Sequence, residues 1–107
     1  MLSRFEVASN DVEGFLGPAR AAVEVLLGRE GCLSVDLGRN LDEPSLWTIT
    51  SRWRDVGSYR RALQGYEAKV AVVPLLSRAV DEPSAYEHHD LVGENHARGA
   101  GPPWVGH

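Results

Sequence analysis

The chain has 107 residues and a net charge of −4, and its arginines are scattered rather than gathered into a basic block, so we expect no nucleic-acid partner. Its single cysteine, Cys32, excludes an intrachain disulfide, and no apolar stretch approaches the roughly 20 residues that span a membrane. These properties predict one soluble domain in the cytoplasm, with no membrane partner.

The first half of the chain predicts a strand, a helix and a two-stranded hairpin. Residues 2–8 alternate between polar and apolar side chains, as in a strand with one buried face. Apolar residues recur with helical spacing over residues 15–27, where Pro18 fits only in a first turn, so the regular helix should start just before it. Two alternating segments, residues 32–41 and 46–54, flank a polar turn and predict the hairpin.

The second half of the chain predicts a broken helical region and a fourth strand. Apolar stripes run through residues 56–80, and Pro74 forbids one straight helix there, so two pieces or a kink are expected. A short strand is predicted at residues 85–89. The resulting order β-α-β-β-α-β is that of the ferredoxin-like α+β fold, in which two helices cover one face of an antiparallel sheet.

This fold predicts a domain over residues 1–90 and an irregular C-terminal tail over residues 91–107. One face of the sheet stays open, and apolar residues occur among those that face away from the helices. A second copy of the chain would cover this face, so we predict a homodimer that stacks sheet on sheet. Trp104 in the tail is predicted to dock on the partner subunit or over the mouth of a pocket.

Five stretches of the sequence carry a resemblance to a known family. They are GCL at 31–33, GRNLDEPSLW through the hairpin, SRW at the end of the third strand, SYRRAL at the start of the second helical region, and VPLLSRAVDEPSAYE. Together, over residues 2–89, they resemble the antibiotic biosynthesis monooxygenase (ABM) family, whose members form dimeric α+β barrels. The best-known branch of the family, whose activity the resemblance implies, oxidises polycyclic aromatic phenols to quinones with O₂ and without a metal or flavin cofactor.

The site pattern of the family places an Asn four residues before a tryptophan of the third strand and a Tyr six residues after it. Trp53 and Tyr59 match this spacing and become the catalytic candidates, while Ile49 stands at the Asn position and the family's later Arg has no counterpart in register. The further substrate-binding candidates, besides Ile49, are Asn10 after the first strand and Tyr66 two helical turns beyond Tyr59. Core packing of the two rings, a cap or turn role for Asn10, and a core or surface role for Tyr66 stay open as alternatives.

Three functions stay open on this sequence. The first is a cofactor-independent monooxygenase that acts on a small hydrophobic, aromatic substrate oriented by Trp53 and Tyr59. The second is a non-catalytic small-molecule-binding or accessory protein of the same fold. The third is a structural dimer whose pocket is filled by its own side chains.

Metal and haem chemistry are not expected. His88 and His89 would point to opposite faces of the predicted strand, so they would not share one ion. The haem-degrading branch of the superfamily needs an axial histidine in the second helical region, and residues 55–80 contain none.

Overall fold

A three-stranded antiparallel sheet forms the base of the protein. The computed structural model describes residues 1–91 of the chain. The strands are β1 (Leu2–Glu6), β2 (Cys32–Arg39) and β3 (Leu46–Trp53). Their spatial order is β1-β3-β2, and β2 and β3 form the predicted hairpin. The side chain of Asn40 closes the hairpin turn, because its Oδ1 accepts hydrogen bonds from the backbone N–H groups of Asp42 and Glu43.

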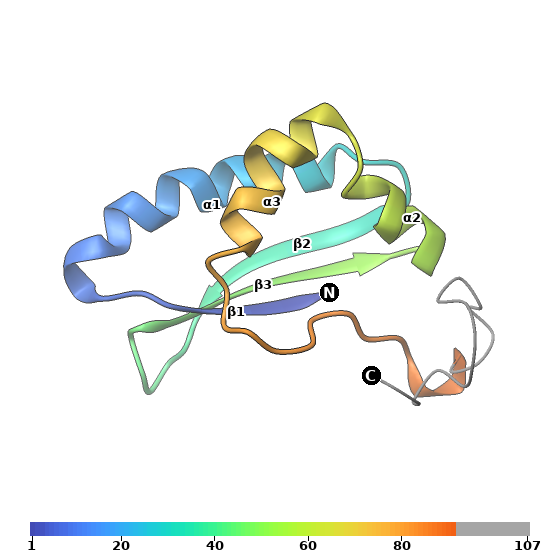
Figure 1. The fold of residues 1–107 in the computed structure, drawn as a ribbon. Coiled ribbons are helices and arrows are strands. Elements are labelled where there is room, and N and C mark those ends of the chain that lie inside the picture. The colour runs from blue at the N-terminus through green and yellow to red at the C-terminus, as the bar shows by residue number, and fades with distance from the viewer. Residues whose placement is uncertain (92–107) are drawn as a thin grey trace.

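Helices cover one face of this sheet. The helices within residues 1–91 are η1 (Ser9–Asp11), α1 (Val12–Leu27), α2 (Val56–Ala62), η2 (Ala68–Val72), α3 (Val73–Leu76) and η3 (His89–Leu91), of which η3 lies away from the sheet. Figure 1 shows α1 and the η2–α3 stretch lying over the strands, with α2 at the end of the sheet. This arrangement confirms the predicted ferredoxin-like α+β fold. No helix within residues 1–91 is long and apolar enough to cross a membrane.

The core lies between the sheet and these helices. Three aromatic rings pack together in the core. The ring centroid of Phe15 in α1 lies 5.1 Å from that of Phe5 and 5.7 Å from that of Trp47. Ile49 of β3 and Val72 of η2 are fully buried beside them. Burial of each large apolar side chain stabilises the fold by about 1.5–3 kcal/mol.

The first helix begins earlier than the sequence predicts. Pro18 lies inside α1, in its second turn, rather than in its first. The proline ring would press against the carbonyl of Gly14, four residues earlier, and its missing N–H leaves that carbonyl without a helical partner. Both residues are exposed, so water can satisfy the carbonyl, and the helix continues through the proline.

Pro74 distorts the second helical region without ending it. The helical stretch over residues 66–76 widens into the π-helix η2 just before the proline. There the Val73 N–H donates to the carbonyl of Ala68, five residues earlier instead of four. The wider turn makes room for a residue that has no N–H to donate. The break of the region lies earlier, at residues 63–65 between α2 and this stretch, so the region consists of two pieces, as predicted.

The predicted fourth strand at residues 85–89 is wrong: these residues are not part of the sheet. Residues 80–84, which we call the return segment, run instead along the free edge of β1 (Figure 1). Two backbone hydrogen bonds hold this segment, from the Val80 N–H to the Arg4 carbonyl at 2.8 Å and from the Leu2 N–H to the Ser84 carbonyl at 2.7 Å. The return segment runs antiparallel to β1, and its last residue, Ser84, is already hydrogen-bonded to Leu2, the first residue of β1. The residues that follow therefore have no strand backbone left to pair with.

The open face of the sheet is mainly polar. Strand alternation and register place there the side chains of Leu2, Arg4, Glu6, Ser34, Asp36, Leu46, Thr48, Thr50 and Arg52. Its apolar part consists of two half-buried leucines. The predicted homodimer therefore stays a prediction. The predicted tail lies outside the described residues from residue 92 onward, and so does Trp104.

Candidate functional site

Trp53 and Tyr59 pack against each other at the junction of β3 and α2. Trp53 is the last residue of β3, and Tyr59 lies in the first turns of α2. Their ring centroids are 6.0 Å apart, with an angle of 57° between the ring planes. This is a tilted aromatic contact of the kind that adds to simple burial. The indole Nε1–H of Trp53 donates to Ser51 Oγ at 2.7 Å, so the indole is fixed in orientation from within its own strand.

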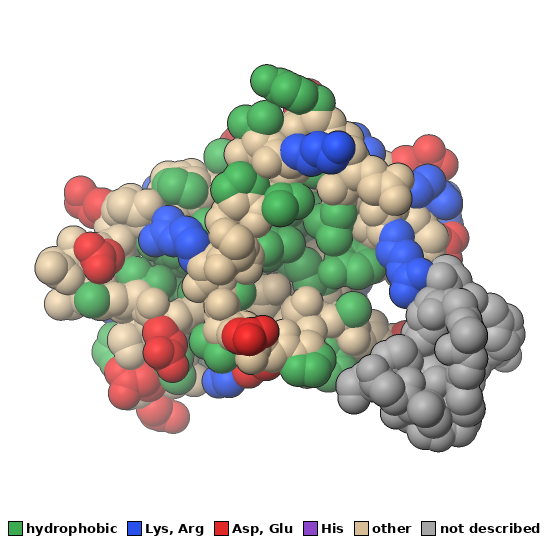
Figure 2. Space-filling view, viewed as in Figure 1, with side chains coloured by type: hydrophobic (Ala, Val, Ile, Leu, Met, Phe, Trp, Pro, Cys, Tyr) green, Lys and Arg blue, Asp and Glu red, His purple; other side chains and the backbone are tan. Residues whose placement is uncertain are grey.

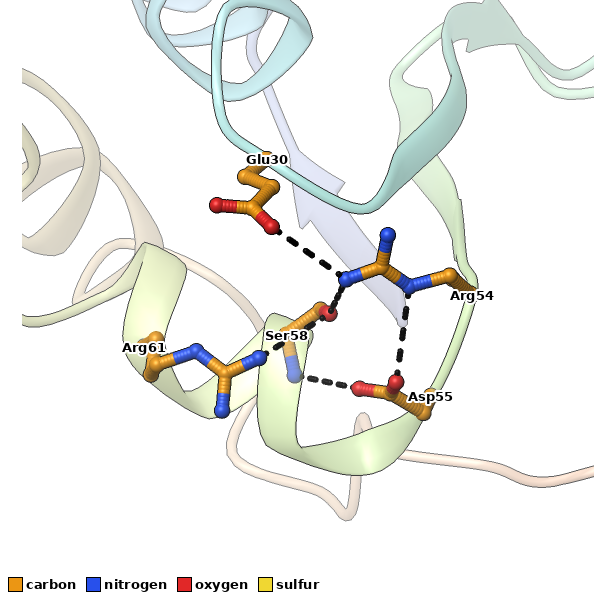
Figure 3. A network of polar contacts seen from close by, with 5 residues as sticks. All are labelled: Glu30, Arg54, Asp55, Ser58 and Arg61. Atoms are coloured by element: carbon orange, nitrogen blue, oxygen red, sulfur yellow. Dashed lines mark hydrogen bonds and ion pairs between the residues drawn. The ribbon is translucent and has the colours of Figure 1, made fainter.

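A polar network around Ser58 fixes the start of α2 and thereby the position of Tyr59. Figure 3 shows the guanidinium groups of Arg54 and Arg61, each of which donates to Ser58 Oγ at 3.3 Å. The Ser58 N–H donates to Asp55 Oδ1 at 2.7 Å, and Asp55 thus caps the helix. This hydrogen bond is the main reason why the pKa of Asp55 is lowered. The network explains the sequence Arg-Asp-Val-Gly-Ser between the two rings.

Gly31 allows this network to approach the sheet closely. Its φ of 84° lies in the left-handed region, which only glycine adopts without strain. A Cβ at this position would lie 2.3 Å from Ser58 Oγ. The Gly31 carbonyl also accepts a hydrogen bond from the Arg54 N–H at 2.7 Å. The tight turn before β2 and the start of α2 are therefore built against each other.

The hydroxyl of Tyr59 keeps its proton at neutral pH. Burial raises the pKa of Tyr59 above its usual value, and hydrogen bonding with the Ser84 side chain and the positive charge of Arg60 offset part of this rise. Tyr59 can therefore donate a hydrogen bond to a ligand oxygen. The contact with Ser84 also connects the aromatic pair to the return segment.

Cavities adjoin this region, but the aromatic pair does not line them. A cavity of about 290 Å³ lies between the start of β1, the end of α3 and the return segment, and Ser84 forms part of its wall. An apolar groove of about 400 Å³ runs between α1 and the η2–α3 stretch. Neither is lined by Trp53 or Tyr59. Figure 2 views the side of the first cavity, where hydrophobic side chains lie recessed between the helices and the return segment.

The other predicted site residues lie in different surroundings. Ile49 is fully buried in the core, on the same face of β3 as Trp53. Asn10 is exposed in η1, and Tyr66 is 82% exposed. The structure therefore brings Trp53 and Tyr59 into contact, but it leaves Asn10 and Tyr66 largely in solvent. The assignment of all five to a site stays a prediction.

Sequence reasoning missed the serine hydroxyl groups that lie against the polar atoms of Trp53 and Tyr59. Ser51 lies two residues before Trp53, so strand alternation could have identified it as a neighbour on the same face. Ser84 lies in a segment without regular structure, and no spacing rule connects it to Tyr59. Ser3, which is only 4% exposed, was also missed, because a serine in an alternating segment reads as solvent-facing.

His88 and His89 do not point to opposite faces, contrary to the expectation from strand alternation. They lie outside the sheet, and their rings stack with centroids 4.7 Å apart. His89 Nε2 lies 2.9 Å from Asp90 Oδ1, and one ligand atom from each of the three residues lies within 4.8 Å of the others. All three side chains are exposed. The expectation that they hold no metal stays a prediction.

The fold and the aromatic junction define a class of small ferredoxin-like α+β proteins with a candidate site between sheet and helices. The sequence profile described as antibiotic biosynthesis monooxygenase matches residues 1–73. The chain belongs to this ABM family.

Solved structures agree with this assignment. A conserved protein from Methanosarcina mazei Go1 has a TM-score of 0.65 at 25% identity, with 78% of this chain and 82% of that chain covered. A candidate antibiotic biosynthesis monooxygenase from Nitrosomonas europaea has a TM-score of 0.65 at 13% identity, with 82% and 95% covered. The second likeness shows the fold alone. The comparison with curated proteins gave no match.

Proposed function

We propose that the protein is a cofactor-independent monooxygenase that acts on a small hydrophobic, aromatic substrate carrying a phenolic oxygen. The observation that carries this proposal is the contact between Trp53 and Tyr59 at 6.0 Å, in a chain of the ABM family. The indole offers an apolar face for a planar ring. The protonated hydroxyl of Tyr59 offers a donor for the oxygen on which negative charge develops.

The proposed reaction balances without an external reductant. The substrate loses a proton and transfers electrons to O₂, and a carbon–oxygen bond forms to give a peroxide. The O–O bond then breaks, one oxygen atom remains as the carbonyl oxygen of the quinone-type product, and the other leaves as water. A ring CH₂ thus becomes C=O. The protein has to bind the neutral phenol, exclude water and stabilise the negative charge that develops on oxygen when the proton leaves.

The proposal includes a homodimer located in the cytoplasm. The two half-buried leucines of the open sheet face, Leu2 and Leu46, and the opposite charges around them suit a second copy of the same face. Light scattering coupled to size-exclusion chromatography tests this directly. A mass twice the 11.7 kDa of the chain supports the dimer, and a mass of one chain over the micromolar range contradicts it.

Oxygen uptake tests the enzymatic proposal. The protein is treated with a chelator and offered a panel of anthrone-like and naphthol-like phenols in an oxygen electrode. The expected result is uptake of one O₂ for each carbonyl product formed, above the rate without protein. Uptake that disappears after chelation contradicts a metal-free reaction.

A second candidate function is binding without catalysis. Two observations favour it: the buried Ile49 stands where the family pattern has an amide, and neither ring of the aromatic pair lines the cavity beside β1 or the groove between α1 and α3. In that case the same phenols change the intrinsic tryptophan fluorescence, while no oxygen uptake accompanies binding. The two measurements on one panel therefore separate the two functions.

A further inference from the structure

We propose that the cavity of about 290 Å³ beside β1 is a ligand site, and that Ser3 binds the hydroxyl group of a neutral aromatic molecule there. The proposal deepens the function proposed above and rests on it for the class of substrate. Ser3 has no part in the family pattern described for the sequence. Its role follows from its burial, its missing partner and its place in the cavity wall.

Ser3 is a buried polar residue with a free hydroxyl. It is 4% exposed, and within residues 1–91 its side chain forms no hydrogen bond. Its Oγ is not fully enclosed, because within residues 1–91 the Trp47 indole nitrogen is the one fully buried side-chain polar atom without a partner. The Ser3 hydroxyl therefore faces open space without a protein partner. Strand alternation turns Ser3 toward the helices, and it lines the cavity. A ligand that fills the cavity would supply the missing partner.

The register of the sheet adds a second argument. Ser3 of β1 lies directly opposite Ile49 of β3 in the antiparallel pair. Side chains of such a pair stand on the same face, about 5 Å apart at their Cβ atoms. Ser3 therefore offers a hydrogen-bonding group beside a position that is itself apolar. β1 therefore offers, through Ser3, the polar group that β3 lacks at Ile49.

The other hydroxyl groups of the cavity wall are already engaged. Ser77 Oγ donates to the carbonyl of Pro74 at 2.6 Å. The Ser84 side chain lies beside the hydroxyl of Tyr59, where its hydrogen-bonding contact lowers the pKa of that tyrosine. Ser3 is thus the wall residue whose hydroxyl is available to a ligand, while Ser84 places that ligand next to the aromatic pair.

The remaining wall residues indicate the chemistry of the ligand. Leu76 and Ala79 offer apolar contacts for a ring. Asp81 and Glu82 also line the cavity, and the Arg4 guanidinium balances only Glu82, through hydrogen bonds of 2.7 and 2.6 Å. This charge balance disfavours an anion. The volume lies at the small end of the range for ligand pockets, which suits one or two rings.

Binding of 1-naphthol and 1-methylnaphthalene tests the role of Ser3. These probes differ only by a hydroxyl in place of a methyl group, and amide chemical shifts of the labelled full chain report where each one binds. We expect 1-naphthol to shift residues of β1, the end of α3 and the return segment. The anionic probe 1-naphthoate should bind more weakly than 1-naphthol.

Two matched variants isolate the hydroxyl. Ser3→Ala should weaken 1-naphthol binding about 3- to 10-fold, the value of one neutral hydrogen bond, and leave 1-methylnaphthalene unchanged. Ser77→Ala removes a hydroxyl from the same wall that already has a partner, so it should leave both affinities unchanged. Ser3→Thr keeps a hydroxyl and should retain most of the preference for 1-naphthol. Thermal unfolding confirms that each variant is folded at the temperature of the titration.

The outcomes separate this proposal from the enzymatic one. Binding at the cavity that depends on Ser3, without oxygen uptake, supports the ligand site and contradicts only the oxygenase. Oxygen uptake that Ser3→Ala leaves unchanged contradicts the ligand site alone. Shifts confined to the groove between α1 and α3, or equal losses in Ser3→Ala and Ser77→Ala, also overturn the proposal.

Discussion

Substitution of Gly31 by alanine should destabilise the protein strongly, because two independent costs add at this position. The φ of 84° places an alanine in the left-handed region, which costs about 1–2 kcal/mol. The new Cβ would lie 2.3 Å from Ser58 Oγ and 2.4 Å from Ser58 Cβ, and relief of such overlap costs about 1–3 kcal/mol. Alanine also restricts the unfolded chain more than glycine does, and this offsets roughly 0.5–1 kcal/mol of the lost stability. A net loss of about 1–4.5 kcal/mol is expected from these values.

Urea unfolding followed by circular dichroism measures this loss. With a slope of about 1.5 kcal/mol per M, the midpoint of Gly31→Ala should fall by about 0.7–3 M. Gly14→Ala is the matched control, since a Cβ at this helical position has nothing within 4 Å, and it should stabilise the protein by about 0.5–1 kcal/mol. Adding Ser58→Gly to Gly31→Ala removes the overlapping atoms and should recover part of the loss. A midpoint for Gly31→Ala equal to that of the wild type would refute this account of the turn.

Three further predictions concern the polar contacts of the site. The pKa of Tyr59 is raised in the folded protein, so its phenol ionises only above pH 10, and the folded state loses stability as the pH rises through this folded pKa. In a spectroscopic titration, Tyr59→Phe should therefore remove the component of the tyrosinate absorbance that appears above pH 10. The hydrogen bond and ion pair with Arg4 lower the pKa of Glu82, so the stability that this pair gives the fold should be lost as the pH falls through the folded pKa of Glu82. On acidification, the urea midpoints of Glu82→Gln and the wild type should therefore converge. Ser51→Ala removes the acceptor of the Trp53 indole and should shift the tryptophan emission, whereas an unchanged spectrum would mean that this hydrogen bond does not form in solution.

Hydrophobic periodicity predicted the sheet and helices well, because one buried face per element leaves a clear pattern. The hairpin, the second helical region in two pieces and the ferredoxin-like α+β fold are confirmed. The fourth strand was wrong for a reason that no local pattern contains. Whether residues 85–89 pair depends on where β1 begins relative to the return segment, and register is a property of two distant segments.

The candidate site was predictable only in part. The spacing of Trp53 and Tyr59 across a strand-to-helix turn predicted their approach, and the two rings are in contact. The hydroxyl groups of Ser3 and Ser84 were not predictable, because tertiary packing decides which serines are buried. Tyr66 lies two helical turns from Tyr59 only if the helix is continuous, and the break after α2 removes this relation.

Turnover by two tyrosine variants tests the central claim most directly. Tyr59→Phe removes the hydroxyl beside Trp53, and Tyr86→Phe makes the same chemical change at a tyrosine that is 66% exposed. With a phenol that supports oxygen uptake, kcat/KM should fall about 100-fold in Tyr59→Phe, the usual loss of a donor that stabilises charge on oxygen, and stay at the wild-type value in Tyr86→Phe. Equal kcat/KM values for Tyr59→Phe and the wild type would contradict the assignment of the β3–α2 junction as the active site.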